Sequence, residues 1–255
     1  MRRELLVALC AFFLMTLTAI TGVYAMEKDE KTNKLIFEEK TDITNGDQEE
    51  MIQLKGDGSD QPENSNFFKE LLLKVTKEKD KPAILTVEGG FDPKLHIIDI
   101  NDDHQKELLL TVSANERGTE KNFYFFQLQE NNIVELQKPE LASVESQFKD
   151  AYKAELKINK EKTYIFDLYD RRNHYEKLGL YHKGRLNEPT ELILSPFSEL
   201  KVTRYNNQTA IKGKQRISGL ATVYTIGYLE TWWTWNKEDW VLQKVKVKEI
   251  SYKGN

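Results

Sequence analysis

Short runs of alternating apolar, β-branched and aromatic residues dominate the chain from Lys34 to Tyr252, and turn-forming residues separate them. Helical periodicity is scarce, so these runs predict strands. Asn131-Asn132, Asn159-Lys160 and the stretch 236–239 predict tight hairpin connections, because asparagine tolerates positive φ. We therefore expect an all-β fold built of antiparallel meander sheets, in which only residues 140–149 could form a short helix.

The composition excludes several classes of protein. The chain has 255 residues, of which 39% are hydrophobic, enough to form a packed core. Its formal net charge is −4, and acidic and basic residues are interspersed, so we expect no nucleic-acid partner. A single cysteine excludes a disulfide framework and a thiolate zinc site.

The N-terminus predicts export. Arg2 and Arg3 precede an apolar run from Leu5 to Val23, and a small-x-small sequence ends at Ala25. This pattern is typical of a signal peptide over residues 1–25, cleaved after Ala25; an uncleaved anchor is the alternative. We expect residues 26–255 to form one β domain that is secreted or associated with the cell envelope, with no membrane span after cleavage.

Two acidic segments resemble each other. Residues 42–54 read DITNGDQEEMIQL, and residues 99–110 read DINDDHQKELLL. Each begins with Asp-Ile, reaches a glutamate eight residues later and continues into an apolar strand. Their separation of 57 residues is about one propeller blade plus a loop.

The second segment predicts a calcium site. Asp99, Asn101 and Asp103 place oxygen-bearing side chains at alternate positions, Glu107 closes the loop, and Gln105 can add its backbone carbonyl. Calcium takes 6–8 oxygen ligands, which such a loop can supply. The alternative is an ordinary β-turn rich in Asp and Asn.

The first segment predicts a poorer calcium site. Asp42, Thr44 and Glu50 hold the matching positions, but Gly46 stands where the third oxygen is expected. Asp47 compensates only if the loop shifts by one residue.

These loops resemble the FG-GAP/VCBS-type repeat, whose blade loops read Asp-x-Asn/Thr-Gly-Asp-Gly-x-x-Glu/Asp before an apolar strand. More widely, residues 88–113 and 222–244 are similar to secreted Gram-positive proteins that contain such repeats. The resemblance implies a calcium-binding, non-catalytic, β-propeller-like module, here of about four irregular blades. The chain departs from the pattern at 113–119, which lacks the expected Gly-rich segment, and at 203–207, where a third acidic loop has lost its carboxylates.

Tryptophans near the C-terminus suggest a second kind of site. Trp233 and Trp235 share one face of a predicted strand and could stack on sugar rings. Core packing and cross-strand aromatic pairing are the alternative. Lysines alternate with valines over residues 244–248, which suits an outer strand or a weak contact with anionic wall polymers.

No nucleophile-and-base motif is visible, so we do not expect an enzyme. The expected function is an exported, calcium-stabilised binding or scaffold protein whose partner is a cell-wall polymer or an extracellular protein. A carbohydrate or wall-polymer binder that uses the tryptophan platform is the first alternative. A hydrolase of envelope polymers is the second.

Overall fold

The structure is a computed structural model, and it describes residues 33–46, 48–58, 65–78, 80–158, 162–236 and 238–251. The predicted signal peptide over residues 1–25, Asp47 and the Asn159-Lys160 turn lie outside these residues. Within them the chain is all-β, with antiparallel meander sheets as expected. No helix in the described ranges is long and apolar enough to cross a membrane.

The N-terminal half forms one seven-stranded sheet in which each strand pairs with the next along the chain. Its strands are β1 (Asn33–Thr41), β2 (Glu50–Asp57), β3 (Phe67–Thr76), β4 (Ala83–Ile98), β5 (Glu107–Ser113), β6 (Lys121–Gln129) and β7 (Asn132–Leu136). Alternation of buried and less buried residues is regular in β2, because one of its faces packs on the core.

A bend in β4 folds this sheet into two packed layers. Residues up to Phe91 pair with β3, whereas Phe91 and the residues after it pair with β5. Gly89 lies so close to β3 that an added Cβ would meet the carbonyl oxygen of Phe68 at 2.0 Å. Gly90 and Asp92 have φ values of 149° and 46°, next to a register shift between Phe91 and Lys94. The bend therefore requires glycine and a β-bulge.

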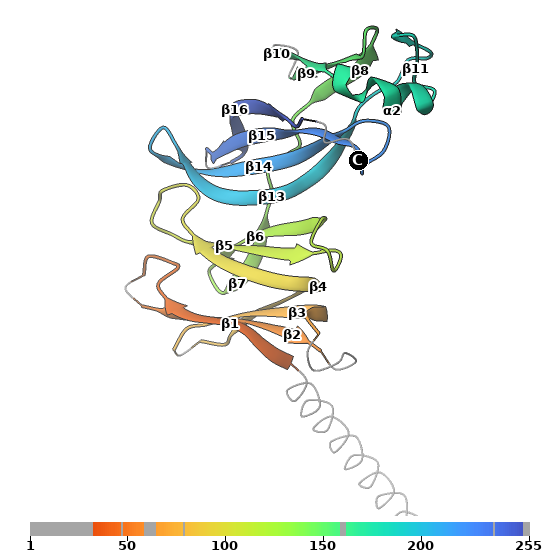
Figure 1. Ribbon diagram of the computed structural model, residues 1–255. Coiled ribbons are helices and arrows are strands. Elements are labelled where there is room, and N and C mark those ends of the chain that lie inside the picture. Colours follow the sequence, from red (N-terminus) through yellow and green to blue (C-terminus); the bar gives the residue numbers. More distant parts are fainter. Residues whose placement is uncertain are drawn as a thin grey trace, which may run out of the picture.

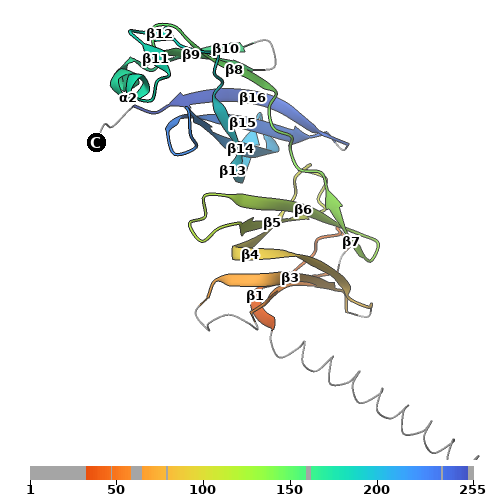
Figure 2. The same cartoon turned by 90° about the vertical axis from the view of Figure 1, so that its right-hand side faces the viewer.

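The two layers enclose the first hydrophobic core. Ile52, Leu54, Leu71 and Leu73 of the first layer are buried together with even-numbered residues of β5 and β6. Figures 1 and 2 show these layers stacked on one another.

The C-terminal half contains two further sheets and the helical turns. Its elements are β8 (Val144–Lys149), β9 (Lys153–Ile158), β10 (Lys162–Asp167), a 3-10 turn (Tyr169–Arg171), α2 (Arg172–Lys177), β11 (Tyr181–His182), β12 (Arg185–Leu186), β13 (Ile193–Tyr205), β14 (Gln208–Ser218), β15 (Thr225–Trp235) and β16 (Trp240–Glu249). Strands β8–β10 form a three-stranded sheet and β13–β16 a four-stranded one. A second core, which includes Phe148, Leu156 and Leu229, lies between them.

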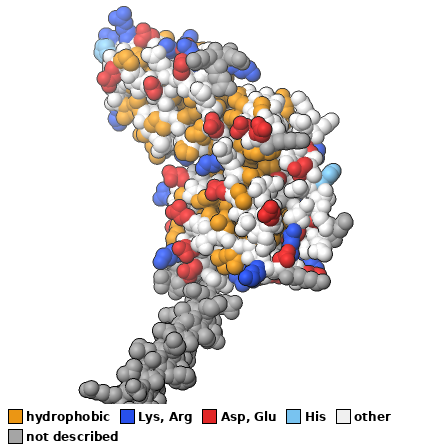
Figure 3. All heavy atoms as spheres, turned by 180° about the vertical axis from the view of Figure 1, so that it is seen from behind, with side chains coloured by type: hydrophobic (Ala, Val, Ile, Leu, Met, Phe, Trp, Pro, Cys, Tyr) orange, Lys and Arg blue, Asp and Glu red, His pale blue; other side chains and the backbone are white. Residues whose placement is uncertain are grey.

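A third cluster joins the two halves of the molecule. Leu109 and Phe125, on the odd-numbered face of β5 and β6, pack with Phe197, Leu200 and Ile211 of the four-stranded sheet. The β5–β6 layer is therefore buried on both faces, and the layers continue upward in Figure 1 from β1 to the β8–β12 region. On the face shown in Figure 3, basic and acidic side chains are interspersed among hydrophobic ones.

Two local predictions were wrong. Residues 140–149, expected as a possible helix, contain strand β8, because pairing with β9 decides their conformation. Residues 169–177 lie outside the one range in which a helix was expected, yet they form the 3-10 turn and α2. Helices this short are marginal alone, so tertiary contacts must hold them. Arg171 supplies such contacts by donating to the carbonyls of Thr225 and Ile250 at 2.9 and 2.8 Å.

Candidate functional site

The two acidic loops are structural repeats. Residues 42–49 connect β1 to β2, and residues 99–106 connect the second half of β4 to β5. In each, the buried glutamate that begins the next strand accepts a hydrogen bond from the backbone seven residues earlier. The Ile43 N–H donates to Glu50 Oε2 at 2.9 Å, and the Ile100 N–H donates to Glu107 Oε2 at 3.0 Å.

The first aspartate of each loop also acts alike. Asp42 Oδ1 accepts the Gly46 N–H at 3.3 Å, and Asp99 Oδ1 accepts the Asp103 N–H at 3.1 Å, both four residues on. The fourth residue of each loop has a positive φ: 56° at Asn45 and 57° at Asp102. The repeat read from the sequence thus corresponds, at the described positions, to two shared hydrogen bonds and one shared turn residue with positive φ.

The second loop concentrates negative charge around a buried carboxylate. Glu107 is 1% exposed. Burial raises the pKa of Glu107 to about 7. The negative charges of Asp103 and Asp99 add to this rise, whereas the hydrogen bond from Ile100 opposes it. No ion pair reaches Glu107 from any residue that the structure describes. A bound cation would therefore relieve an unfavourable arrangement.

The buried glutamate of the first loop already has a cation beside it, supplied by the β3–β4 connection. Glu50 is fully buried, and Lys77 Nζ lies 3.5 Å from its Oε1. The Thr44 hydroxyl donates to the same oxygen at 2.9 Å. Lys77 thus gives Glu50 an ion pair for which Glu107 has no counterpart among the described residues. The sequence motif does not reveal this pair, because Lys77 lies beyond it.

The predicted ligands of the second loop are already involved in turn hydrogen bonds. The Asp103 N–H donates to Asn101 Oδ1 at 3.0 Å, and Asp103 Oδ1 accepts the Gln105 N–H at 2.8 Å. Asn101 Nδ2 donates to Asp103 Oδ2 at 2.7 Å. His104 has φ of 70°, and its N–H donates to Asp99 Oδ2 at 2.9 Å. Among the described residues, no three carboxylate, imidazole or thiol groups converge as a metal cluster. Coordination by this loop would therefore have to include the Asn101 amide and the Gln105 carbonyl.

The loops contact one another in a column on the left of Figure 1. The Lys106 N–H donates to the Ile43 carbonyl at 2.9 Å, which joins the first loop to the second. Asp102 accepts the Thr209 N–H and hydroxyl at 2.9 and 2.7 Å, which joins the second loop to β14. Asp102 therefore docks the layers and does not face the predicted ligands.

The segment 203–207, which matches the position of a third loop but lacks its carboxylates, contains a tight hairpin turn. Asn206 and Asn207 have φ values of 48° and 66°, and they lie between the paired residues Tyr205 and Gln208. Two successive positive φ values are typical of a type I′ turn. This connection is too short to surround an ion.

The tryptophans divide between core and surface. Trp233 is 6% exposed, and its Nε1 donates to the Thr231 hydroxyl at 2.9 Å. Trp235 is half-buried and meets Trp240 edge to face at 5.2 Å. Trp240 contacts Phe125 and donates to the Gln137 carbonyl at 2.7 Å, so this cluster helps to join the two halves. Trp233 in particular presents no surface on which a sugar ring could stack.

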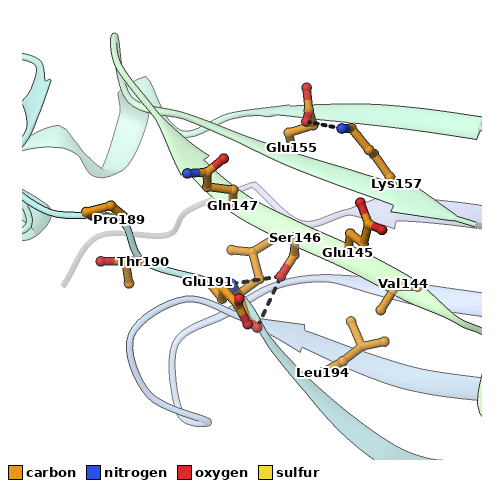
Figure 4. A pocket seen from close by; sticks show the side chains of 11 residues that line it. Val144, Glu145, Ser146, Gln147, Glu155, Lys157, Pro189, Thr190, Glu191 and Leu194 are labelled. Atoms are coloured by element: carbon orange, nitrogen blue, oxygen red, sulfur yellow. Dashed lines mark hydrogen bonds and ion pairs between the residues drawn. The ribbon is translucent and has the colours of Figure 1, made fainter. Parts of the chain in front are cut away.

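A pocket of about 590 Å³ lies between β8 and the segment 189–194, as Figure 4 shows. The Ser146 hydroxyl accepts the Leu192 N–H at 3.0 Å and lies 3.4 Å from the Leu192 carbonyl. Glu155 pairs with Lys157 at 3.5 Å. No histidine is among the residues that line this pocket, so Ser146 has no neighbouring imidazole base there.

Comparison with known proteins assigns one region of the chain. Residues 142–248 match the family model described as the YybI C-terminal domain. The match covers less than half of the chain, and it comprises the elements around the second hydrophobic core without the acidic loops. No curated protein and no solved structure gives a significant match to the chain.

Proposed function

We propose that the protein is an exported, non-enzymatic binding or scaffold protein of the cell exterior, stabilised by calcium at the loop 99–107. The observation that carries the proposal is the contrast between two equivalent buried glutamates. Glu50 has Lys77 beside it, whereas Glu107 has Asp99 and Asp103 as its charged neighbours. A divalent cation would have in the second loop the role that lysine has in the first.

The ligand set favours calcium. Carboxylate, amide and backbone carbonyl oxygens are hard ligands, and calcium accepts more of them, in less regular geometry, than magnesium does. Asp99, Asn101, Asp103 and Glu107 would coordinate through side chains, and Gln105 through its carbonyl. For the first loop, Asp42, Thr44, Asp47 and Glu50 remain the weaker proposal, since the Lys77 ammonium already lies beside Glu50.

The resemblance to FG-GAP/VCBS repeats supports the same proposal. Both loops connect the first two strands of a layer and adopt one hydrogen-bonded conformation. A propeller-like closure of the stacked layers and an origin in a Gram-positive envelope belong to this proposal. The N-terminal sequence supports export, and the lack of a nucleophile-and-base motif in the sequence is the reason that the role is proposed as non-catalytic.

The thermal midpoint of the purified chain in chelator and in millimolar calcium tests the proposal. Binding to the native state alone adds about 2.7 kcal/mol at a hundredfold excess over Kd, which corresponds to roughly 5–10 °C. Asp103→Ala should abolish most of this increase. Asp102→Ala removes an equal charge from the same loop and is the matched control; it should lower the midpoint in both conditions but keep the increase.

Absence of a calcium-dependent increase in the parent chain would refute the calcium site. An equal reduction of the increase in both variants would show that the effect does not depend on the proposed ligands.

A further inference from the structure

One face of the four-stranded sheet is strongly basic, although the whole chain is acidic. On β15, Tyr228, Glu230 and Trp232 point to this face, and the strand register places a cation on either side of each. These flanking cations are Lys212, Lys214 and Arg216 of β14, and Lys244, Lys246 and Lys248 of β16. Two rows of three cations therefore border a central strand.

The central side chains hold several of these cations in place. Lys212 and Lys248 each lie 2.9 Å from Glu230 Oε1. The ammonium groups of Lys212 and Lys244 lie 4.9 Å from the Trp232 ring centroid, one from each neighbouring strand. Such contacts reduce the side-chain freedom that binding would otherwise have to remove.

The charge on this face exceeds what the fold requires. Lys201 and Glu199 of β13 lie on the same face of the sheet. This face therefore carries seven cations and two carboxylates, a formal net charge of +5. The formal charge of the chain is −4. Lys201 lies directly opposite Lys212, an arrangement that destabilises a sheet. Protection of a sheet edge can account for the lysines of the edge strands β13 and β16, but not for the three cations of β14, which is an interior strand.

The face is accessible to a partner. The Lys212 and Lys248 side chains are 30% and 50% exposed, and Lys244 and Lys246 are exposed. The opposite face of the same strands packs on the second and third cores through residues such as Ile211 and Leu229. One face thus stabilises the fold, while the other faces solvent.

The spacing of the cations suits an extended polymer. Alternate residues of a strand are about 6.8 Å apart, and the rows on β14 and β16 are separated by roughly 9.5 Å, two strand spacings. We propose that this face binds a linear phosphodiester polymer of the cell exterior, laid along β15 between the two rows of cations. The location of the polymer rests on the proposed export, whereas the binding residues are separate from the acidic loops.

Retention of the purified full chain on immobilised poly(glycerol phosphate) tests the proposal, with neutral dextran and phosphatidylglycerol vesicles as comparison surfaces. Lys244→Gln combined with Lys246→Gln should weaken binding at least tenfold. It should also reduce the slope of log K against log salt by about 1–2, since each phosphate contact contributes roughly 0.7–0.9. The matched control combines Lys69→Gln and Lys94→Gln, two exposed lysines of β3 and β4, and should bind as the parent does.

Lys244→Arg combined with Lys246→Arg should bind as the parent does, which separates loss of charge from damage to the sheet. Equal weakening by the two glutamine pairs, or retention on dextran as strong as on the polymer, would overturn the proposal. Retention on the vesicles without retention on the polymer would overturn it in favour of a membrane surface. The calcium-dependent thermal shift should persist in all these variants, so failure here is distinct from failure of the calcium site.

Discussion

Replacing each of the two equivalent glutamates by glutamine should change stability in opposite directions in the absence of calcium. Glu107→Gln keeps an oxygen for the Ile100 N–H and removes a buried charge that lies beside Asp99 and Asp103. Glu50→Gln keeps the acceptor for the Ile43 N–H but removes the carboxylate that pairs with Lys77. The two substitutions are chemically identical and differ only in their electrostatic surroundings.

The magnitude follows from the pKa of Glu107. An ordinary glutamate has a pKa of 4.5, and burial beside Asp103 and Asp99 raises that of Glu107 to about 7. Because the folded state holds this proton more tightly than the unfolded state, stability falls as pH rises from about 4.5 to about 7. The full penalty, on the order of 3 kcal/mol, is present above pH 7. Glu107→Gln removes this penalty but weakens one hydrogen bond, so we expect a net gain of about 1–3 kcal/mol at pH 8.

Urea unfolding followed by circular dichroism, in chelator at pH 8 and at pH 5, measures these differences. Glu107→Gln should stabilise the chain at pH 8 and have little effect at pH 5, where the parent carboxyl is protonated. Glu50→Gln should destabilise it by roughly 1–3 kcal/mol at pH 8. In millimolar calcium Glu107→Gln should no longer be more stable than the parent chain, because the substitution removes one of the proposed calcium ligands. Destabilisation by Glu107→Gln in chelator at pH 8 would refute the reasoning.

Three further perturbations test other parts of the structure. Lys77→Met should destabilise the chain by on the order of 3 kcal/mol in chemical unfolding, since it leaves the buried Glu50 carboxylate unpaired; an unchanged midpoint would contradict this role. Phe125→Ala should cost about 3–5 kcal/mol, because its fully buried ring packs between the two halves, and limited proteolysis should then cut near residues 138–142 first. Burial opposes ionisation of Glu230, but hydrogen bonds from Lys212 and Lys248 outweigh it and lower its pKa. The stability that the ionised carboxylate contributes should therefore be lost as pH falls below 4.5. Glu230→Gln should make the free energy of unfolding less dependent on pH in this acid range.

The sequence by itself determined the fold class and the existence of a loop repeat. Alternating apolar runs commit a chain to strands, because only a half-buried sheet satisfies a period of two. The Asp-Ile start and the glutamate eight residues later specify one turn conformation, since their carboxylates satisfy backbone N–H groups within the same loop. These are local interactions, and local interactions can be read from a linear pattern.

Tertiary structure decided what the loops and faces can do. Lys77 reaches Glu50 from a different strand connection, so the electrostatic difference between two similar loops is invisible in either motif. Trp233 is buried because its face of β15 packs inward, which strand alternation alone did not decide. The lysines of β14 and β16 are about 30 residues apart in the sequence, and only their pairing with β15 brings them to one face. Charge complementarity and burial depend on distances between strands, and those distances exist only after the sheets have packed.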